Sequence, residues 1–380
     1  MCALSRKTLE REFDGNRGRF VEEWKRLLTF PSISAEPEHR ADCVACARWL
    51  VRQLAGMGFK ARALRAPGKP VVFAERRGKP GRPVVLFYGH YDVQPVDPLD
   101  AWLSPPFEPS LRKGRLYARG ASDNKGQLMY ALKAIETLAR NGELDATIKI
   151  IVEGEEEGFG SALSTVLEES RELVQADVLV VTDVDAVSLD VPAIIMGLRG
   201  IVHLTAVLSG PGHDLHSGIH GGAAPNPAAA MARLLATLNR ADGRIAVAGY
   251  YDGVRRPTAR ERMLAGEGQP SPRDYEKQTG VLPEGGEKGF SLAERVGFRP
   301  TIEINGIHTG YGGPGSKTVI PTHAVAKITS RLVAGQDPGA CLQAVIRHLK
   351  RHTPAGLTLE ITERGIGGRA VRVPLDSPAV

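Results

Sequence analysis

The chain has 380 residues, a length that predicts two or three domains, each large enough to bury a hydrophobic core. Hydrophobic residues make up 42% of it and charged residues 24%, which is typical of a globular protein and too apolar for a disordered one. The formal net charge is +6, and lysines and arginines are scattered, so nucleic-acid binding is not indicated. No apolar stretch of about 18 residues and no signal-peptide pattern occurs, so the sequence predicts neither a membrane-spanning nor a secreted protein.

The four cysteines are too few for a disulfide framework: Cys2, Cys43, Cys46 and Cys341. Reduced thiols of this number are typical of a cytoplasmic protein. The spacing of Cys43 and Cys46 also occurs in redox and zinc sites. No second pair lies nearby and the surrounding stretch has the apolar spacing of a helix, so we expect these thiols to pack in a core.

The first half of the chain alternates helical patterns with apolar strands. The expected helices are 20–28, 41–54, 125–140 and 161–170, and the expected strands are 70–75, 83–88, 147–152 and 177–182. Buried strands that alternate with helices predict an α/β fold, with a mostly parallel sheet flanked by helices. We assign residues 1–196 to this domain, which we expect to carry the catalytic site.

After Pro192 the strands become half-exposed and alternate between apolar and polar residues. The expected strands are 201–209, 301–305, 323–332 and 357–362, the expected helices are 227–239 and 338–351, and residues 266–289 are expected to form a polar loop. This pattern predicts a smaller α+β domain, inserted at 197–364, that serves as a lid or dimerisation domain. The chain would return to the first domain at 365–380.

Acidic residues and a histidine follow the predicted parallel strands. Strand 83–88 leads into His90 and Asp92, strand 147–152 leads into the acidic run 153–157, and strand 177–182 leads into Asp183. A further acidic residue, Asp123, precedes the helix at 125–140. The carboxyl edge of a parallel sheet is where ligands bind, so these side chains are expected to meet there.

Each of these residues also has a purely structural explanation when it is taken alone. His90 could be a core histidine, Asp123 a helix cap and the acidic run a solvated turn. Together they offer the imidazole and carboxylate ligands that suit zinc or manganese. Asp92 lies two residues after His90 on the same face of a strand, so it can orient the imidazole.

Five motifs occur in this order between residues 89 and 222: GHYDVQP, W-x-x-PPF, LYARGASDNKG, EGEEEGFGS and DLHSGIHGG. Together they resemble the di-zinc metallopeptidase family of carnosinase, cytosolic non-specific dipeptidase, aminoacylase, acetylornithine deacetylase and succinyl-diaminopimelate desuccinylase. The resemblance that they carry runs from about residue 20 to the C-terminus. The segments 315–321 and 330–332 make the dipeptidase branch the most similar. The resemblance therefore implies metal-dependent hydrolysis of dipeptides or short peptides.

Roles in the metal site follow from this resemblance, residue by residue. His90 and Asp183 match ligands of one metal ion, Asp123 matches the carboxylate that bridges both ions, and Glu157 matches a ligand of the second. Glu156 matches the general base that takes a proton from the attacking water. The implied cofactors are two divalent ions, with Zn²⁺ preferred over Mn²⁺ or Co²⁺. As the metal ligand, Asp183 is preferred to Asp185 because of its spacing from Pro192. The resemblance also implies a cis peptide bond between Asp123 and Asn124.

The resemblance also implies substrate-binding residues in the inserted domain. His216 matches the group that stabilises the oxyanion, and it acts across a homodimer in the family. Thr318 and Arg331 match residues that bind the substrate carboxylate, a task that suits the two-pronged guanidinium group. The expected partners are a small peptide and a second copy of the chain, with no nucleic acid and no membrane.

Three patterns imitate other sites. His213, His216 and His220 have the spacing of a metal-binding helix face, but the glycines around them argue against a helix. Residues 310–318 resemble a phosphate-binding loop in which Ser316 breaks the required Gly-Lys pair. Residues 365–370 resemble a dinucleotide fingerprint, and we expect them to form a loop that returns to the first domain.

The chain also departs from the family pattern. A Gly-Gly-Ser loop and the last histidine ligand of the family would lie beyond Val380, and Ile366 stands where the family has a further histidine. We therefore expect a weakened second metal site in a chain whose C-terminal segment is missing. Two alternatives remain open: hydrolysis of N-acyl amino acids, and a non-catalytic dimerising remnant.

Overall fold

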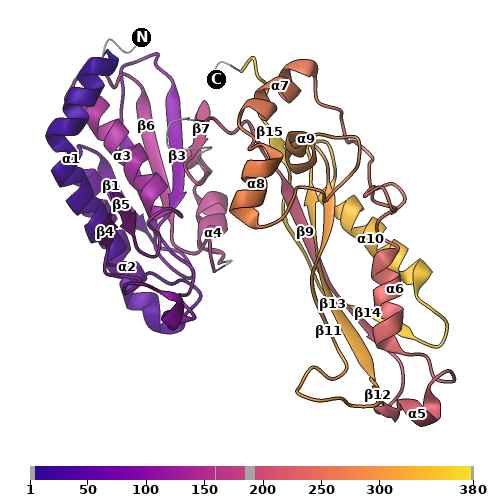
Figure 1. Cartoon of the computed structure of the whole chain (residues 1–380). Helices are drawn as coiled ribbons and strands as arrows, with labels where there is room; N and C mark the ends of the chain where they lie inside the picture. Colours follow the sequence, from indigo (N-terminus) through magenta and orange to yellow (C-terminus); the bar gives the residue numbers. More distant parts are fainter. Residues whose placement is uncertain (1–4, 159, 185–192, 378–380) are drawn as a thin grey trace. The chain divides into compact units, whose positions relative to one another are not determined.

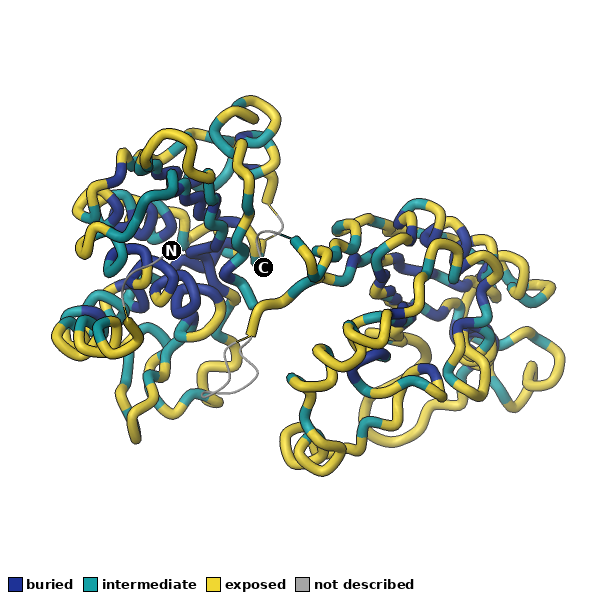
Figure 2. The backbone as a smooth tube through the Cα atoms, turned by 90° about the horizontal axis from the view of Figure 1, so that it is seen from above, coloured by how far each residue is buried: buried dark blue, intermediate teal, exposed yellow. Residues whose placement is uncertain are grey.

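A computed structural model describes residues 5–158, 160–184 and 193–377. The chain divides into two compact units, residues 1–185 and 186–380, which Figure 1 shows in sequence colours. Each unit has its own buried core, drawn in dark blue in Figure 2. The predicted domain limits at 196 and 364 stay a prediction. Asp185 and Pro192, which entered the assignment of Asp183, lie outside the described residues.

A five-stranded sheet with the order β1-β2-β6-β3-β7 forms the centre of the first unit. Its strands are β1 (Lys60–Leu64), β2 (Val71–Arg76), β3 (Val84–His90), β6 (Thr147–Glu153) and β7 (Val178–Val181). Strand β3 is parallel to both β6 and β7, and β2 alone runs against the other four strands. The α/β fold with a mostly parallel sheet is therefore confirmed.

Helices cover both faces of this sheet. They are α1 (Arg6–Leu28), α2 (Arg40–Gly56), α3 (Lys125–Arg140) and α4 (Ala162–Glu169), and a separate hairpin is formed by β4 (Ser110–Arg112) and β5 (Arg115–Tyr117). Helices α1, α2 and α3 share one core with the sheet, and α4 packs on a second core through Ala162 and Val166. The apolar spacing of α2 buries Cys43 and Cys46 as free thiols, which confirms that they pack in the core.

The second unit is built on an antiparallel sheet with the order β11-β13-β9-β14. Its strands are β9 (Gly200–Ser209), β11 (Thr301–Thr309), β13 (His323–Leu332) and β14 (Thr358–Gly368). Alternate residues of β13 are buried against α6 (Pro227–Ala236) and α10 (Pro338–His352), so one face of the sheet is covered by helices. The predicted α+β character of this unit follows from that alternation.

Short elements complete the second unit: β8 (Gly197–Leu198), β10 (Leu215–His216), α5 (Ser217–His220), α7 (Ala259–Glu267), α8 (Pro272–Thr279), α9 (Leu292–Gly297), β12 (Val319–Ile320) and β15 (Val371–Arg372). The polar loop predicted at 266–289 was wrong in part, because it contains α8, which Ser271 caps by accepting from the N–H of Asp274. The return loop predicted at 365–370 was also wrong, since β14 pairs with β9 as far as Gly368. Among the described helices, none is long and apolar enough to cross a membrane.

Candidate metal and catalytic site

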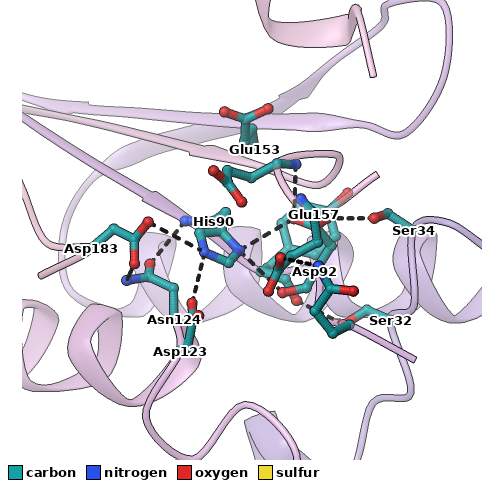
Figure 3. A network of polar contacts seen from close by, with 12 residues as sticks. Ser32, Ser34, His90, Asp92, Asp123, Asn124, Glu153, Glu157 and Asp183 are labelled. Carbon is teal, nitrogen blue, oxygen red and sulfur yellow. Dashed lines mark hydrogen bonds and ion pairs between the residues drawn. The ribbon is translucent and has the colours of Figure 1, made fainter. Parts of the chain in front are cut away.

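The predicted ligands meet at the carboxyl edge of the first unit's sheet. His90 ends β3, and it lies opposite Glu153 at the end of the parallel strand β6. Asp183 follows the last residue of β7 by two positions, and Asp123 precedes α3. Figure 3 shows dashed contacts from the ring of His90 to both aspartates. The parallel register of the strands thus brings together residues that are far apart in the sequence.

His90 is fully buried and directs its Nε2 atom toward two carboxylates. Nε2 lies 3.2 Å from Oδ1 of Asp123 and 3.7 Å from Oδ2 of Asp183. This nitrogen has no hydrogen-bond partner among the described residues. A buried polar atom without a partner is unfavourable, and a divalent cation between the imidazole and the carboxylates would satisfy all three groups. The donor set therefore fits a metal ion.

Glu157 adds a further carboxylate to this edge. Its ligand atom and those of His90 and Asp123 all lie within 4.8 Å of one another. Within residues 5–158, 160–184 and 193–377, this is the only such group of three or more His, Cys, Asp or Glu ligand atoms. Among the described residues, the histidines of the motif at 213–220 form no such group. The sequence argument against a helix there was wrong in part, because Ser217–His220 form the single turn of α5.

Asp92 connects the imidazole to the acidic loop after β6. Nδ1 of His90 lies 3.4 Å from Oδ1 of Asp92 and 3.1 Å from its backbone carbonyl oxygen. The backbone N–H groups of Glu156 and Glu157 donate to the same carboxylate at 3.3 and 3.0 Å, and the hydroxyl of Ser34 donates at 2.5 Å. One buried aspartate therefore fixes both the imidazole and the loop that carries two of the predicted site residues.

The Asp123–Asn124 peptide bond is cis, as the resemblance implied. The side chain of Asn124 is buried and accepts from the backbone N–H of His90 at 3.0 Å. Its Nδ2 donates to Oδ1 of Asp183 at 3.4 Å. Sequence reasoning did not identify Asn124, Ser34 or Gln127 as parts of the site, because no motif marks a hydrogen bond between such distant positions.

The charges of the site shift two pKa values in the metal-free protein. Burial lowers the pKa of His90, but hydrogen bonding to Asp92 and the charges of Asp92, Asp183 and Glu156 outweigh it and raise this pKa to about 9. Burial raises the pKa of Glu156 to about 7; His90 opposes this shift, while the neighbouring carboxylates, Glu157 first, add to it. Both groups would hold protons near neutral pH until a cation binds.

Two other glutamates of the acidic run have structural partners. Glu153 accepts a 2.6 Å hydrogen bond from the hydroxyl of Tyr88. The buried carboxylate of Glu155 accepts from the backbone N–H groups of Lys69 and Ala162 at 3.1 and 3.2 Å. Neither was chosen from the sequence as a site residue, and these contacts give each a structural role.

The second unit brings together two of its three predicted site residues. Strand β10 pairs with β12, and Nε2 of His216 lies 3.2 Å from Oγ1 of Thr318. Figure 1 shows β12 beyond the end of the sheet at which β13 begins. Arg331 lies eight residues after His323 along β13, which is about 26 Å at the rise of an extended strand. The pair of His216 and Thr318 is therefore remote from Arg331 within one chain.

Sequence comparison connects this geometry to known proteins. The profile of Peptidase family M20/M25/M40 matches residues 86–252, and that of a peptidase dimerisation domain matches residues 196–357. The Beta-Ala-His dipeptidase of Rattus norvegicus is 30% identical over 367 residues, which span 90% of this chain and 74% of the relative. The chain belongs to the peptidase family M20/M25/M40.

Further proteins are similar to this chain in sequence or in structure. The Cys-Gly metallodipeptidase dug1 of Schizosaccharomyces pombe is 28% identical and covers 92% of this chain and 76% of the relative. The crystal structure of an M20 family metallo-carboxypeptidase from Sulfolobus solfataricus has a TM-score of 0.79 and 33% identity, with 94% of this chain and 80% of that chain covered. The crystal structure of human carnosine dipeptidase 1 has a TM-score of 0.75 and 28% identity, and the match covers 97% of this chain and 81% of that chain. The M20 chain is therefore a metallopeptidase that uses divalent metal ions, and it contains an M20 dimerisation domain.

Proposed function

We propose that this M20 protein hydrolyses dipeptides, with two divalent metal ions at the carboxyl edge of the first unit's sheet. The observation that carries the proposal is the buried Nε2 of His90, which has no hydrogen-bond partner among the described residues and faces the carboxylates of Asp123 and Asp183. Relatives that are named as dipeptidases, of which this chain covers 74% and 76%, support the substrate class. The ligands include an imidazole, so Zn²⁺ is the proposed metal, ahead of Mn²⁺ and Co²⁺.

Five residues share the chemistry of the proposed site. His90 and Asp183 would hold the first ion, Asp123 would bridge both ions, and Glu157 would hold the second. Bound cations of this kind polarise a scissile carbonyl and lower the pKa of a water molecule. Asp92 would keep the imidazole of His90 oriented through the contact at its Nδ1.

Glu156 is the proposed general base. Its backbone is anchored to the Asp92 carboxylate, but it is not part of the group that includes Glu157 and His90. A carboxyl group that is not engaged by a metal ion can accept a proton from water and pass it to the leaving amine. In the metal-free protein, burial raises the pKa of this carboxyl group, so it has a higher proton affinity than an exposed glutamate.

The second unit would bind the substrate through His216, Thr318 and Arg331. His216 is the proposed oxyanion donor, and Arg331 and Thr318 would hold the carboxylate of the peptide. Arg331 lies far along β13 from the pair of His216 and Thr318. This separation supports a homodimer, because two chains can combine residues that are far apart within one chain. The proposed lid or dimerisation domain is 197–364.

The cytoplasm is the proposed compartment. Cys43, Cys46 and Cys341 are buried free thiols, as expected where glutathione keeps cysteines reduced. Burial raises the pKa of Cys46 to about 11, so this thiol stays protonated and unreactive in the folded protein.

A substrate panel tests this function. The purified chain would be stripped with a chelator, reloaded with Zn²⁺, Mn²⁺ or Co²⁺, and assayed with Ala-containing dipeptides, their N-acetylated forms and N-acetyl amino acids. We expect metal-dependent hydrolysis of the free dipeptides and little hydrolysis of the other two classes. Preferred cleavage of N-acetyl amino acids would favour the deacylase alternative, and preferred cleavage of N-acetyl dipeptides would indicate a carboxypeptidase. No metal-dependent cleavage of any class would support the non-catalytic alternative.

A further inference from the structure

Two buried amide side chains link the separate segments that carry the proposed ligands. Oδ1 of Asn124 accepts from the backbone N–H of His90 at 3.0 Å. Nδ2 of Asn124 donates to Oε1 of Gln127 at 3.1 Å and to Oδ1 of Asp183 at 3.4 Å. Gln127 then donates from Nε2 to the backbone carbonyl of Val184 at 3.2 Å. The ends of β3 and β7 are thereby connected through the first turn of α3.

The direction of this hydrogen-bond chain is fixed at both ends. The backbone N–H of His90 can only donate, and the backbone carbonyl of Val184 can only accept. Each amide between them must therefore turn its oxygen toward His90 and its nitrogen toward Val184. Asn124 is fully buried and Gln127 is 7% exposed, so water cannot readily replace a lost partner. One arrangement of the two amides satisfies every group.

We propose that Gln127 is a positioning residue for the metal site. Its bond to Val184 fixes the backbone next to Asp183, and its bond to Asn124 fixes the amide that contacts the Asp183 carboxylate. Together these bonds hold the loop after β7 where Asp183 and His90 can share one cation. This inference rests on the proposed ligand set, in which Asp183 belongs to the first metal ion.

Metal affinity separates a positioning role from a purely structural one. The metal-free chain would be titrated with Co²⁺, whose visible spectrum reports the geometry of its ligands, with competition for affinity. The test variant is Gln127→Met, which keeps the length of the side chain but removes both hydrogen bonds. Gln127→Glu is a second variant, because a carboxylate can accept from Asn124 but cannot donate to Val184 when it is ionised.

A glutamine in the second unit supplies the matched control. Gln336 is 5% exposed, donates to the carbonyl of Tyr250 at 2.6 Å and to Sγ of Cys341 at 3.5 Å, and accepts from the N–H of Val333 at 2.9 Å. Gln336→Met therefore also removes the hydrogen bonds of a buried amide, but in a unit that contains none of the proposed metal ligands. Thermal unfolding of the metal-free variants would show whether the two substitutions destabilise the protein to a similar degree.

We expect both Gln127 variants to bind the first Co²⁺ about 10- to 100-fold more weakly than the unmodified chain, with an altered spectrum, as is typical when partners of metal ligands are lost. Gln336→Met should leave the affinity and the spectrum unchanged. Unchanged Co²⁺ binding by Gln127→Met would overturn the inference. Asp183→Asn distinguishes failure of the positioning role from failure of the ligand assignment. If Asp183→Asn weakens Co²⁺ binding and Gln127→Met does not, only the positioning role of Gln127 fails. If neither change affects Co²⁺ binding, the ligand assignment fails as well.

Discussion

The hydroxyl of Ser34 donates a 2.5 Å hydrogen bond to the carboxylate of Asp92, 58 residues further along the chain. Both side chains are buried, and the other partners of the Asp92 side chain are His90 and the backbone of the acidic loop. The segment between α1 and α2 therefore contacts the proposed metal site through Asp92. No sequence motif marks this contact.

Ser34→Ala should weaken metal binding without removing a ligand. Asp92 would lose one donor, and its hold on His90 and the loop of Glu157 would loosen. We expect about a 10-fold loss of affinity for the first metal ion, at the lower end of the effect of such supporting groups. Ser164→Ala is the matched control, because the Ser164 hydroxyl donates to the nearby Ser161 carbonyl at an exposed position. Equal affinity in both variants would show that Ser34 has no part in the site.

Metal binding should release protons near neutral pH. The pKa of His90 is raised to about 9 in the metal-free protein, so the imidazole is mostly protonated at pH 7, yet only its neutral form can bind a metal ion. As the pH falls below 9, protons compete with the metal, and affinity should decrease by up to about tenfold per pH unit from this group alone. Zn²⁺ added to a weakly buffered sample at pH 7 should acidify it. His90→Ala should release fewer protons, and the absence of any release from the unmodified chain would contradict the raised pKa.

The two metal sites should differ in strength. The proposed ligand set assigns His90, Asp123 and Asp183 to one ion, and Asp123 and Glu157 to the other. An imidazole with two carboxylates binds zinc more strongly than two carboxylates alone, so we expect one tight and one weak equivalent per chain. Asp123→Ala should lose both, because it removes the shared ligand. Metal analysis after gel filtration tests this, and two tight equivalents in Asp123→Ala would exclude a bridging role.

Mixed dimers test whether His216 acts across the subunits. His216→Ala and Glu156→Gln are each expected to have little activity alone. A co-refolded or exchanged mixture contains heterodimers in which one of the two sites combines an intact Glu156 with an intact partner His216. Random pairing of equal amounts should restore about a quarter of the unmodified activity. A mixture no more active than its two components would place His216 in the same chain as the site it serves.

The sequence predicted the parts of the fold that depend on apolar periodicity. The helix at Lys125–Arg140 and the strand at His323–Leu332 have the predicted bounds, because each has a regular apolar pattern. The helix α8 was missed because it has no buried residue, so its sequence lacks an apolar stripe. Strand β14 was predicted too short because its second half is glycine-rich and mostly exposed, and only pairing with β9 makes it a strand.

The proposed ligands and one support, Asp92, could be named from the sequence, but the other supports could not. His90 and Asp183 follow recognisable strands, and His90 and Asp92 belong to one motif. Asn124 and Gln127 act through single hydrogen bonds to distant backbone groups, and such bonds depend on the tertiary structure. The separation of Arg331 from His216 likewise follows from the length and direction of β13, which the motifs do not encode.

The most direct test of the whole account is the Glu156→Gln variant of the metal-loaded protein, assayed for dipeptide hydrolysis and analysed for bound metal. Glu156 is the proposed base and not a ligand, so the variant should keep the metal content of the unmodified chain. It should lose the roughly 10²- to 10⁴-fold that general base catalysis contributes. Glu168→Gln, an exposed position on α4, is the control and should keep both properties. Near-normal turnover, or loss of bound metal in Glu156→Gln, would contradict the proposed division of roles.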